Sequence, residues 1–224
     1  YENTLRVEGD ARLTMEDLLT ALSSKTQAKA DRTAEVAAQK TQRSEDIIKV
    51  EPQGELLEAV RRALPEDSIL ISGMTQLGYY SRAHYPVYEP RTFITSSYSG
   101  NLGYAYPTAL GAKVAQPDKA VVCLSGDGGF MFTSQELSTA VQEEVCLPIV
   151  VFNDQAYSQL ETFFTRSHGR SDPFRLTGPD LKTYARAFGV PPSRVSSPRG
   201  LRTALTKALD RSGPTVIDYA LSST

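Results

Sequence analysis

The stretch AVVCLSGDGGF at residues 120–130 joins a continuous apolar run to a glycine-rich turn that encloses one aspartate, Asp127. Further along, PIVVFNDQAYS at 148–158 has a similar arrangement, because its apolar run ends in an Asn-Asp pair. Short continuous apolar runs are typical of strands that helices cover on both faces of a parallel sheet. The polar residues that end each run would then lie at the carboxyl edge of the sheet, where α/β proteins bind their ligands.

Helical and strand patterns alternate along most of the chain. This alternation predicts an α/β fold, a doubly wound and mainly parallel sheet with helices on both faces. Loops are expected between the first strand and the helix at 103–116, and from the strand at 148–152 to about residue 178. The predicted strands are 68–72, 120–125, 148–152 and 215–220, and the predicted helices are 53–64, 103–116, 134–144, 180–189 and 199–211.

The first part of the chain follows a different pattern. Residues 14–22 predict a helix with Thr14 as N-cap, and the polar residues 23–45 predict an exposed linking helix that has no core-facing stripe. Residues 1–22 look like the end of a preceding domain, so we expect the sequence to be a piece of a longer protein. The resulting domain division is 1–22, a linking segment 23–50 and an α/β domain 51–224.

The overall composition excludes several classes of protein. The 24 basic and 26 acidic residues nearly cancel and form no long block of one sign, so nothing indicates binding to nucleic acid or to an anionic membrane. No apolar run approaches the roughly 20 residues that span a bilayer. The two cysteines, Cys123 and Cys146, are too few for a disulfide framework and are predicted to be small buried apolar residues. We therefore expect a cytoplasmic protein.

The glycines around Asp127 suggest an anion site. Gly126, Gly128 and Gly129 let the backbone approach a ligand closely. Thr133 and Glu136 have the spacing of a capping box for the next helix, and a helix N-terminus beside a glycine turn suits phosphate.

The carboxylate of Asp127 would repel a phosphate in the same place. A divalent cation between them removes the repulsion, and Mg²⁺ commonly bridges one or two carboxylates to substrate phosphates. Asp154 can supply a second oxygen ligand, and a backbone carbonyl just after it can supply a third. The two strand ends together therefore predict one metal–diphosphate site.

Other interpretations of these motifs are weaker. Taken alone, each motif is more typical of a simple tight turn than of a binding site, so the prediction depends on their joint arrangement. SGDGGFMF lacks the G-x-G-x-x-G spacing of dinucleotide-binding turns, because Met131 stands where the third glycine belongs. The chain also has no G-x-x-x-x-G-K-[ST] phosphate loop.

The stretches GDG, QELSTAV and LPIVVFNDQAY together closely resemble the signature of thiamine diphosphate-dependent enzymes. The resemblance is to the C-terminal, diphosphate-binding domain of the group that contains acetolactate synthase, pyruvate decarboxylase and benzoylformate decarboxylase. SSYSGNLGYAYPTALGAKVAQPD at 96–118 is similar to a second conserved stretch of that group, and the resemblance runs from about residue 50 to the C-terminus. Residues 1–22 resemble the last strand and helix of the group's central domain.

The resemblance implies a role for individual residues. The metal ligands would be Asp127, Asp154 and the carbonyl of Ala156; the group usually has a second Asn where Asp154 stands, so this site would be more acidic. Leu102 would hold the cofactor in its bent conformation, although core packing is an equally simple role. The complete set of implied cofactor-binding residues is Met74, Thr75, Gln76, Gly100, Asn101, Leu102, Gly126, Asp127, Gly128, Gly129, Asp154, Ala156, Tyr157 and Ser158. Tyr157 and Ser158 would begin a helix.

Four further residues are candidates for contact with a substrate. His84 and His168 are predicted to lie in loops, where a histidine is most often simply solvated. Arg166 and Arg170 could bind a carboxylate, but solvent-exposed arginines are the commoner case.

The resemblance also implies what lies outside this chain. In the group, the glutamate that activates the cofactor belongs to a pyrimidine-binding domain, in the same full-length chain or in a neighbouring subunit. We therefore expect no catalytic side chain and no activity in this segment alone, and thiamine diphosphate with Mg²⁺ as cofactors. The full enzyme would be a homodimer or homotetramer that acts on a 2-oxo acid, by carboligation or by decarboxylation. The alternative is a non-catalytic binding or assembly module with the same fold.

Overall fold

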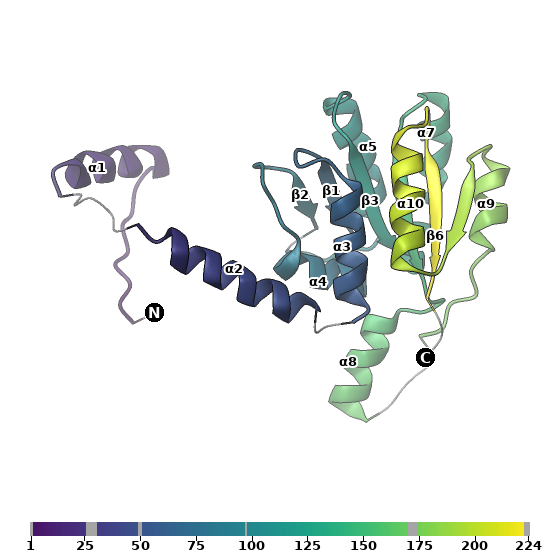
Figure 1. Ribbon diagram of the computed structural model, residues 1–224, viewed down its shortest axis with the longest axis horizontal. Helices are drawn as coiled ribbons and strands as arrows, with labels where there is room; N and C mark the ends of the chain where they lie inside the picture. The colour runs from purple at the N-terminus through teal and green to yellow at the C-terminus, as the bar shows by residue number, and fades with distance from the viewer. Residues whose placement is uncertain (1, 26–30, 49–50, 97, 170–173, 222–224) are drawn as a thin grey trace. The chain divides into compact units, whose positions relative to one another are not determined.

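The computed structural model describes residues 2–25, 31–48, 51–96, 98–169 and 174–221. The chain divides into two compact units, Tyr1–Asp46 and Ile47–Thr224 (Figure 1). No described helix combines the length and the apolar character that crossing a membrane requires.

The smaller unit contains the helix α1 (Ala11–Ser23) and most of α2 (Thr33–Ile48). Thr14 is not the N-cap of α1, so that prediction is wrong. The carboxylate of Asp10 accepts hydrogen bonds from the backbone N–H groups of Arg12 (3.0 Å) and Leu13 (3.1 Å), and the helix therefore begins one turn earlier. The described residues before α1 form no strand, which would need a paired neighbour to satisfy its backbone.

The larger unit is built on one six-stranded sheet in which every pairing is parallel. This confirms the predicted doubly wound α/β fold. The strand order is β2-β1-β3-β4-β6-β5. The strands are β1 (Ile69–Ser72), β2 (Phe93–Thr95), β3 (Val121–Gly126), β4 (Pro148–Asn153), β5 (Pro192–Val195) and β6 (Thr215–Ala220). The helices are α3 (Gln53–Ala63), α4 (Gln76–His84), α5 (Ala105–Ala115), α6 (Asp127–Met131), α7 (Leu137–Gln142), α8 (Ser158–His168), α9 (Leu181–Ala187) and α10 (Pro198–Leu209).

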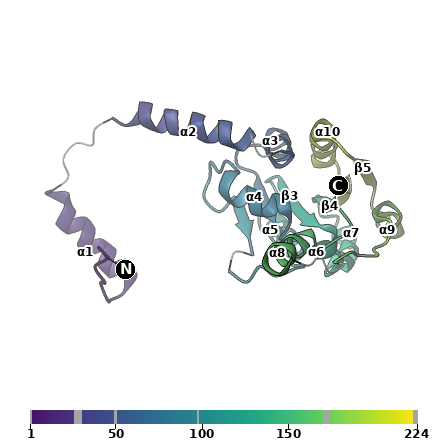
Figure 2. The same cartoon turned by 90° about the horizontal axis from the view of Figure 1, so that it is seen from below.

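Both faces of the strands β1, β3, β4 and β6 are buried, which explains why these four are continuous apolar runs. Side chains alternate between the faces of a strand. Ile69 and Ile71 therefore join one apolar core, whereas Leu70, which lies between them, joins the other. Figure 2 shows α3 and α10 on one side of the sheet and α5, α7 and α9 on the other.

The order of the strands creates a crevice at the carboxyl edge of the sheet. From β1 the chain moves outward to β2, and it then crosses back to β3 on the other side of β1. The connections that leave β1 and β3 therefore diverge, and such a switch point is where doubly wound sheets bind ligands.

Several elements differ from the sequence prediction. The edge strands β2 and β5 were not predicted, because neither is a buried apolar run. The helices α4 and α8 occupy stretches that the sequence pattern assigned to loops, but the start of α8 at Ser158 confirms the helix that the family resemblance implied at Tyr157 and Ser158. The predicted helix at 134–144 is a short 3₁₀ turn, Ser134–Glu136, followed by α7.

The capping box predicted at Thr133 and Glu136 is also wrong. The hydroxyl of Thr133 donates to the carbonyl of Gly103 (3.0 Å), and it accepts no capping hydrogen bond from the turn that follows. The carboxylate of Glu136 accepts from the Thr139 hydroxyl (2.9 Å). The first helical turn after β3 is instead α6, which begins at Asp127 itself.

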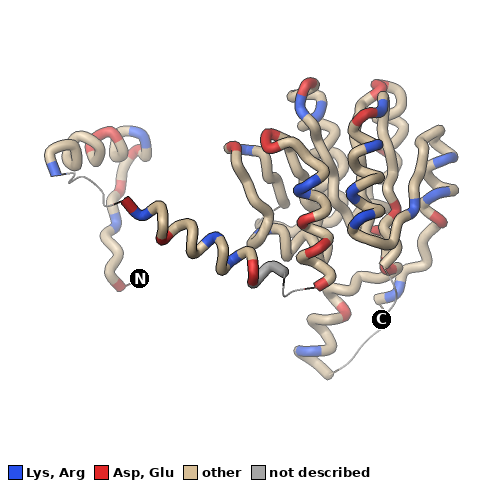
Figure 3. The backbone as a smooth tube through the Cα atoms, in the orientation of Figure 1, with Lys and Arg blue, Asp and Glu red and all other residues tan. Residues whose placement is uncertain are grey.

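The charges of the larger unit are mixed. Basic and acidic residues are interspersed along it (Figure 3), as expected for a chain with a net charge of −2.

We predict that Gly111→Ala stabilises the protein. Gly111 is an exposed residue inside α5, and a Cβ atom at this position would meet nothing within 4 Å. Because alanine favours the helix, the free energy of unfolding should rise by about 0.5–1 kcal/mol in urea denaturation. Gly103→Ala is the matched control and should destabilise, since Gly103 has a φ of +79° and its Cβ would lie 2.8 Å from that of Phe132. If Gly103→Ala also raised the free energy of unfolding, the close contact and the positive φ at Gly103 would not be the constraint described here.

We predict that Asp180→Asn lowers the free energy of unfolding at neutral pH but has little effect near pH 2. Asp180 caps α9 by accepting from the N–H of Thr183 (2.8 Å), and it pairs with Arg194 (2.7 Å). These two contacts lower the pKa of Asp180 from 3.8 to about 2. A lowered pKa contributes stability above pH 3.8 that is lost as the pH falls towards 2. The urea midpoints of wild type and variant should therefore differ at pH 7 and converge at pH 2. The same difference in midpoint at pH 7 and at pH 2 would show that the charge of Asp180 does not stabilise the fold.

Candidate functional site

A pocket of about 690 Å³ opens at the carboxyl ends of β1, β3 and β4. It lies at the switch point between β1 and β3. Asn101 is the one implied cofactor residue that is not among its lining residues, and its side chain is exposed. The implied residues that line the pocket are Met74, Thr75, Gln76, Gly100, Leu102, Gly126, Asp127, Gly128, Gly129, Asp154, Ala156, Tyr157 and Ser158.

Asp127 directly follows β3 and is half-buried. Burial raises the pKa of its carboxyl to about 6; the hydrogen bond from the N–H of Gly128 lowers this pKa in part, and the nearby Asp154 carboxylate raises it. The N–H of Gln155 also donates to Asp127 and thereby ties the loop after β3 to the loop after β4. Two carboxylates in a half-buried place disfavour each other's charge, and a bound cation would relieve this repulsion.

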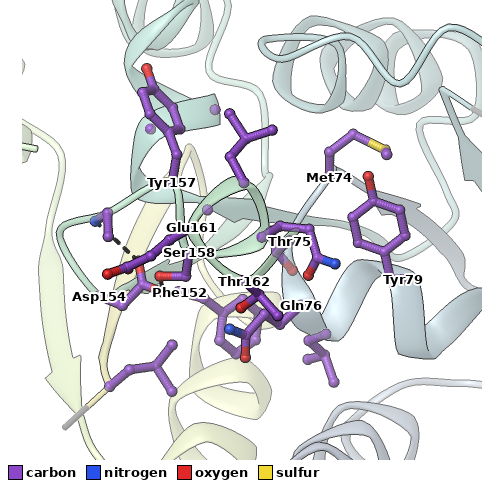
Figure 4. Close-up of a pocket in the computed structure, with 18 of the residues that line it drawn as sticks. Met74, Thr75, Gln76, Tyr79, Phe152, Asp154, Tyr157, Ser158, Glu161 and Thr162 are labelled. Atoms are coloured by element: carbon purple, nitrogen blue, oxygen red, sulfur yellow. Dashed lines mark hydrogen bonds between the residues drawn. The ribbon is translucent and has the colours of Figure 1, made fainter. Parts of the chain in front are cut away.

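Asp154 is held by two hydrogen bonds from its own loop. The hydroxyl of Ser158 donates to Oδ2 (2.6 Å), and the backbone N–H of Ala156 donates to Oδ1 (3.3 Å) (Figure 4). A carboxylate oxygen accepts more than one bond, so these contacts fix the side chain and leave it able to bind a cation.

The backbone of Ala156 is oriented by an isolated antiparallel bridge to Arg175. The bridge bonds are made by the neighbours of Ala156: the N–H of Tyr157 donates to Phe174 (2.8 Å), and the carbonyl of Gln155 accepts from Leu176 (2.7 Å). In this type of pair, the N–H and C=O of the central residue point away from the partner strand. The N–H of Ala156 accordingly reaches Asp154, and its carbonyl points away from Arg175.

The end of β4 is fixed by a buried charge. Asp218 on β6 is fully buried and accepts from Asn153 (3.1 Å) and from Arg194 (2.6 Å). A buried carboxylate needs such partners, because its desolvation is costly. The amide of Asn153 is therefore immobilised beside Asp154.

Gly128 lies so close to two neighbouring side chains that a residue with a Cβ atom would clash with them. A Cβ atom on this buried glycine would lie 2.5 Å from Cε1 of Tyr157 and 2.9 Å from Cδ1 of Leu176. A Cβ on Gly129 would lie 3.6 Å from Cδ2 of Leu102, so the loop before α5 closes on the same turn. The glycines thus form a tight cradle under the pocket.

The opposite wall of the pocket comes from β1 and α4. Thr75 caps α4 by accepting from the N–H of Gly78 (2.8 Å). The sulfur of Met74 accepts from Arg82 (3.1 Å). In Figure 4, Met74 and Tyr79 lie across the pocket from Asp154 and Tyr157. Loops from three strand ends therefore enclose one space.

Sequence reasoning missed much of the wall that α8 contributes. Glu161, Thr162 and Thr165 line the pocket together with Arg166. The apolar spacing of Leu160, Phe163 and Phe164, followed by Gly169 with a φ of +64°, is a helix-and-stop signal that could have revealed this helix.

The remaining candidates are distributed as follows. His84 and His168 are the last residues of α4 and α8 rather than loop residues, and neither lines the pocket. Arg170 lies outside the described residues. Arg175, which belongs to none of the sequence motifs, does line the pocket.

The sequence pattern of the family "Thiamine pyrophosphate enzyme, C-terminal TPP binding domain" matches residues 73–219, a range that includes the strand ends around the pocket. The chain belongs to this family. The prediction made from the GDG and Asn-Asp stretches is thereby confirmed at the level of the family.

Named relatives within the thiamine pyrophosphate enzymes support this assignment. The chain is 30% identical over 164 residues to acetolactate synthase of Bacillus subtilis, covering 73% of this chain and 29% of that one. It is 30% identical over 221 residues to a probable 2-ketoarginine decarboxylase of Pseudomonas aeruginosa, covering 97% and 39%. A Rhodococcus jostii thiamine diphosphate-dependent 4-hydroxybenzoylformate decarboxylase has a similar structure, with a TM-score of 0.68, 26% identity and coverage of 75% and 32%. The chain thus spans well under half the length of these relatives.

The residues of the pocket fit the cofactor of this family. Two carboxylates and a backbone carbonyl are hard oxygen donors of the kind that Mg²⁺ prefers. No three His, Cys, Asp or Glu side chains cluster in the part of the chain that the structure describes, so the donor set is not that of an all-side-chain metal cage. The glycine turn lines the same pocket as these donors.

We predict that Gly128→Ala weakens the binding of thiamine diphosphate. The added methyl group must displace Tyr157 and Leu176, both of which adjoin the loop that carries Asp154. Affinity in the presence of Mg²⁺ should fall about tenfold, or 1.4 kcal/mol, in isothermal titration calorimetry. Gly111→Ala adds a methyl group in open space and should bind as the wild type does. Unchanged affinity in Gly128→Ala would show that the cradle is not used.

Proposed function

We propose that this chain forms the metal- and diphosphate-binding half of the active site of a thiamine diphosphate-dependent enzyme that acts on 2-oxo acids. Asp127, Asp154 and the carbonyl of Ala156 hold Mg²⁺, and the glycine turn at 126–129 receives the diphosphate. The observation that carries the proposal is the convergence of these groups in one pocket at the switch point of the sheet.

The residues of this chain bind and orient the cofactor. When bound, thiamine diphosphate supplies a nucleophilic carbon and an electron sink for cleaving the bond beside the carbonyl of a 2-oxo acid. Leu102 and Met74 line the pocket from opposite loops and support the cofactor between them. Asp127 and Asp154 neutralise the cation that the diphosphate requires.

Other parts of the enzyme complete the site. We propose that a pyrimidine-binding domain, in the same full-length chain or in a neighbouring subunit, brings the activating glutamate, and that the enzyme is a homodimer or homotetramer. This chain alone is then inactive. The named relatives include both acetolactate synthase and decarboxylases, so the proposal covers carboligation and decarboxylation alike. The free thiols of Cys123 and Cys146 favour a reducing, cytoplasmic location.

We predict that Asp127→Asn in the full-length protein abolishes Mg²⁺-dependent binding of thiamine diphosphate. The change keeps the size of the side chain but removes the charge that the cation requires, so affinity should fall at least a hundredfold, or about 2.7 kcal/mol, in titration calorimetry. Asp118→Asn is the matched control, because Asp118 is exposed and precedes the opposite end of β3.

Two results would argue against the proposal. Wild-type affinity in Asp127→Asn would remove this residue from the metal site. Cofactor binding without turnover of any 2-oxo acid by the full-length protein would favour the alternative, a non-catalytic binding or assembly module.

A further inference from the structure

The charges around the pocket do not balance once the proposed ligands are bound. Asp127 and Asp154 together offset the two positive charges of Mg²⁺. The diphosphate then adds at least two negative charges, and Glu161 on α8 adds another at the pocket wall. The thiazolium ring of the cofactor supplies one positive charge, so a net negative charge remains, and an additional cation beside the diphosphate would stabilise the bound cofactor.

Two arginines, Arg166 and Arg175, line the same pocket. Arg166 lies on α8 eight residues after Ser158, which is about 12 Å along the helix at 1.5 Å per residue. It is therefore remote from the helix end that adjoins the metal ligands. Arg175 is opposite Ala156 in the antiparallel bridge, and Cα atoms in such a pair are about 4.5 Å apart.

The backbone of Arg175 is held on both sides. The ring of Phe174 packs against Phe164 with 5.2 Å between ring centroids. On the other side, Leu176 lies against Gly128, as the close approach to a Cβ at that position shows. Arg175 is thus fixed between α8 and the glycine turn, next to the loop that carries Asp154.

The guanidinium group of Arg175 is also uncommitted within the described structure. Arg194 pairs with Asp180 and Asp218, whereas no described carboxylate pairs with Arg175. Its side chain is exposed, so it can turn towards an anion that enters the pocket. A guanidinium group matches the geometry of phosphate oxygens and keeps its charge at any relevant pH.

We propose that Arg175 binds the diphosphate of thiamine diphosphate and offsets the negative charge that Asp154 adds to the metal site. This inference rests on the proposed function and adds to it a residue outside the glycine turn and the metal ligands. Asp154 and Arg175 then form a functional pair, linked through the backbone of Ala156.

The first test measures cofactor affinity by titration calorimetry in the full-length protein with Mg²⁺. Arg175→Gln should weaken thiamine diphosphate binding at least tenfold and thiamine monophosphate binding less, because the lost contact is to the diphosphate. Arg175→Lys should recover part of the affinity by restoring the charge. Arg202→Gln, at an exposed arginine of α10, is the control and should bind as the wild type does.

The second test is a double-mutant cycle with Asp154→Asn. If Arg175 offsets the charge of Asp154, Arg175→Gln should cost less than threefold in affinity when residue 154 is Asn. An equal loss in both backgrounds would overturn the inference. So would an unchanged cofactor affinity combined with a raised KM for the 2-oxo acid, which would make Arg175 a substrate-binding residue. These outcomes are distinct from a failure of the proposed function, in which the wild type itself shows no Mg²⁺-dependent binding.

Discussion

The parallel register of β1, β3 and β4 is the constraint on which the site depends. Ser72 pairs with Leu124, and Gly126 pairs with Phe152, so the three strands end together at one edge of the sheet. Asp127 and Asp154 follow these paired residues almost immediately. Because the chain leaves β1 and β3 in opposite directions, the edge stays open as a pocket and is not covered by a connecting loop.

A second constraint is the strained turn at Gln155, which has a φ of +54°. This left-handed conformation is uncommon for a residue other than glycine and needs support from its surroundings. The N–H of Gln155 donates to Asp127, and its carbonyl accepts from Leu176. One residue therefore joins the loop after β3, the loop after β4 and the segment that follows α8, and the positions of all three are coupled.

The sequence predicted some parts of the site better than others. The glycine turn and Asp154 were found because each motif directly follows an apolar run, and that pattern is local. The family resemblance placed the start of a helix at Tyr157 and Ser158, and α8 begins there. The residue pattern alone assigned this stretch to a loop, because the half-exposed surface of α8 lacks a wide apolar stripe. Arg175 was missed for a different reason: its bridge to Ala156 is a single isolated pair, which leaves no periodic pattern in the sequence.

By itself, the sequence determined which runs become buried strands, which residues carry charge and glycine at the strand ends, and the family to which the chain belongs. These features depend on neighbours within a few residues, because burial on both faces of a sheet demands continuous apolar runs. Only the tertiary structure decided the strand order that opens the pocket, the place of Tyr79 in its wall, and the position of Arg175 opposite Ala156. Such contacts join distant segments, and they follow from packing across the whole sheet rather than from any local pattern.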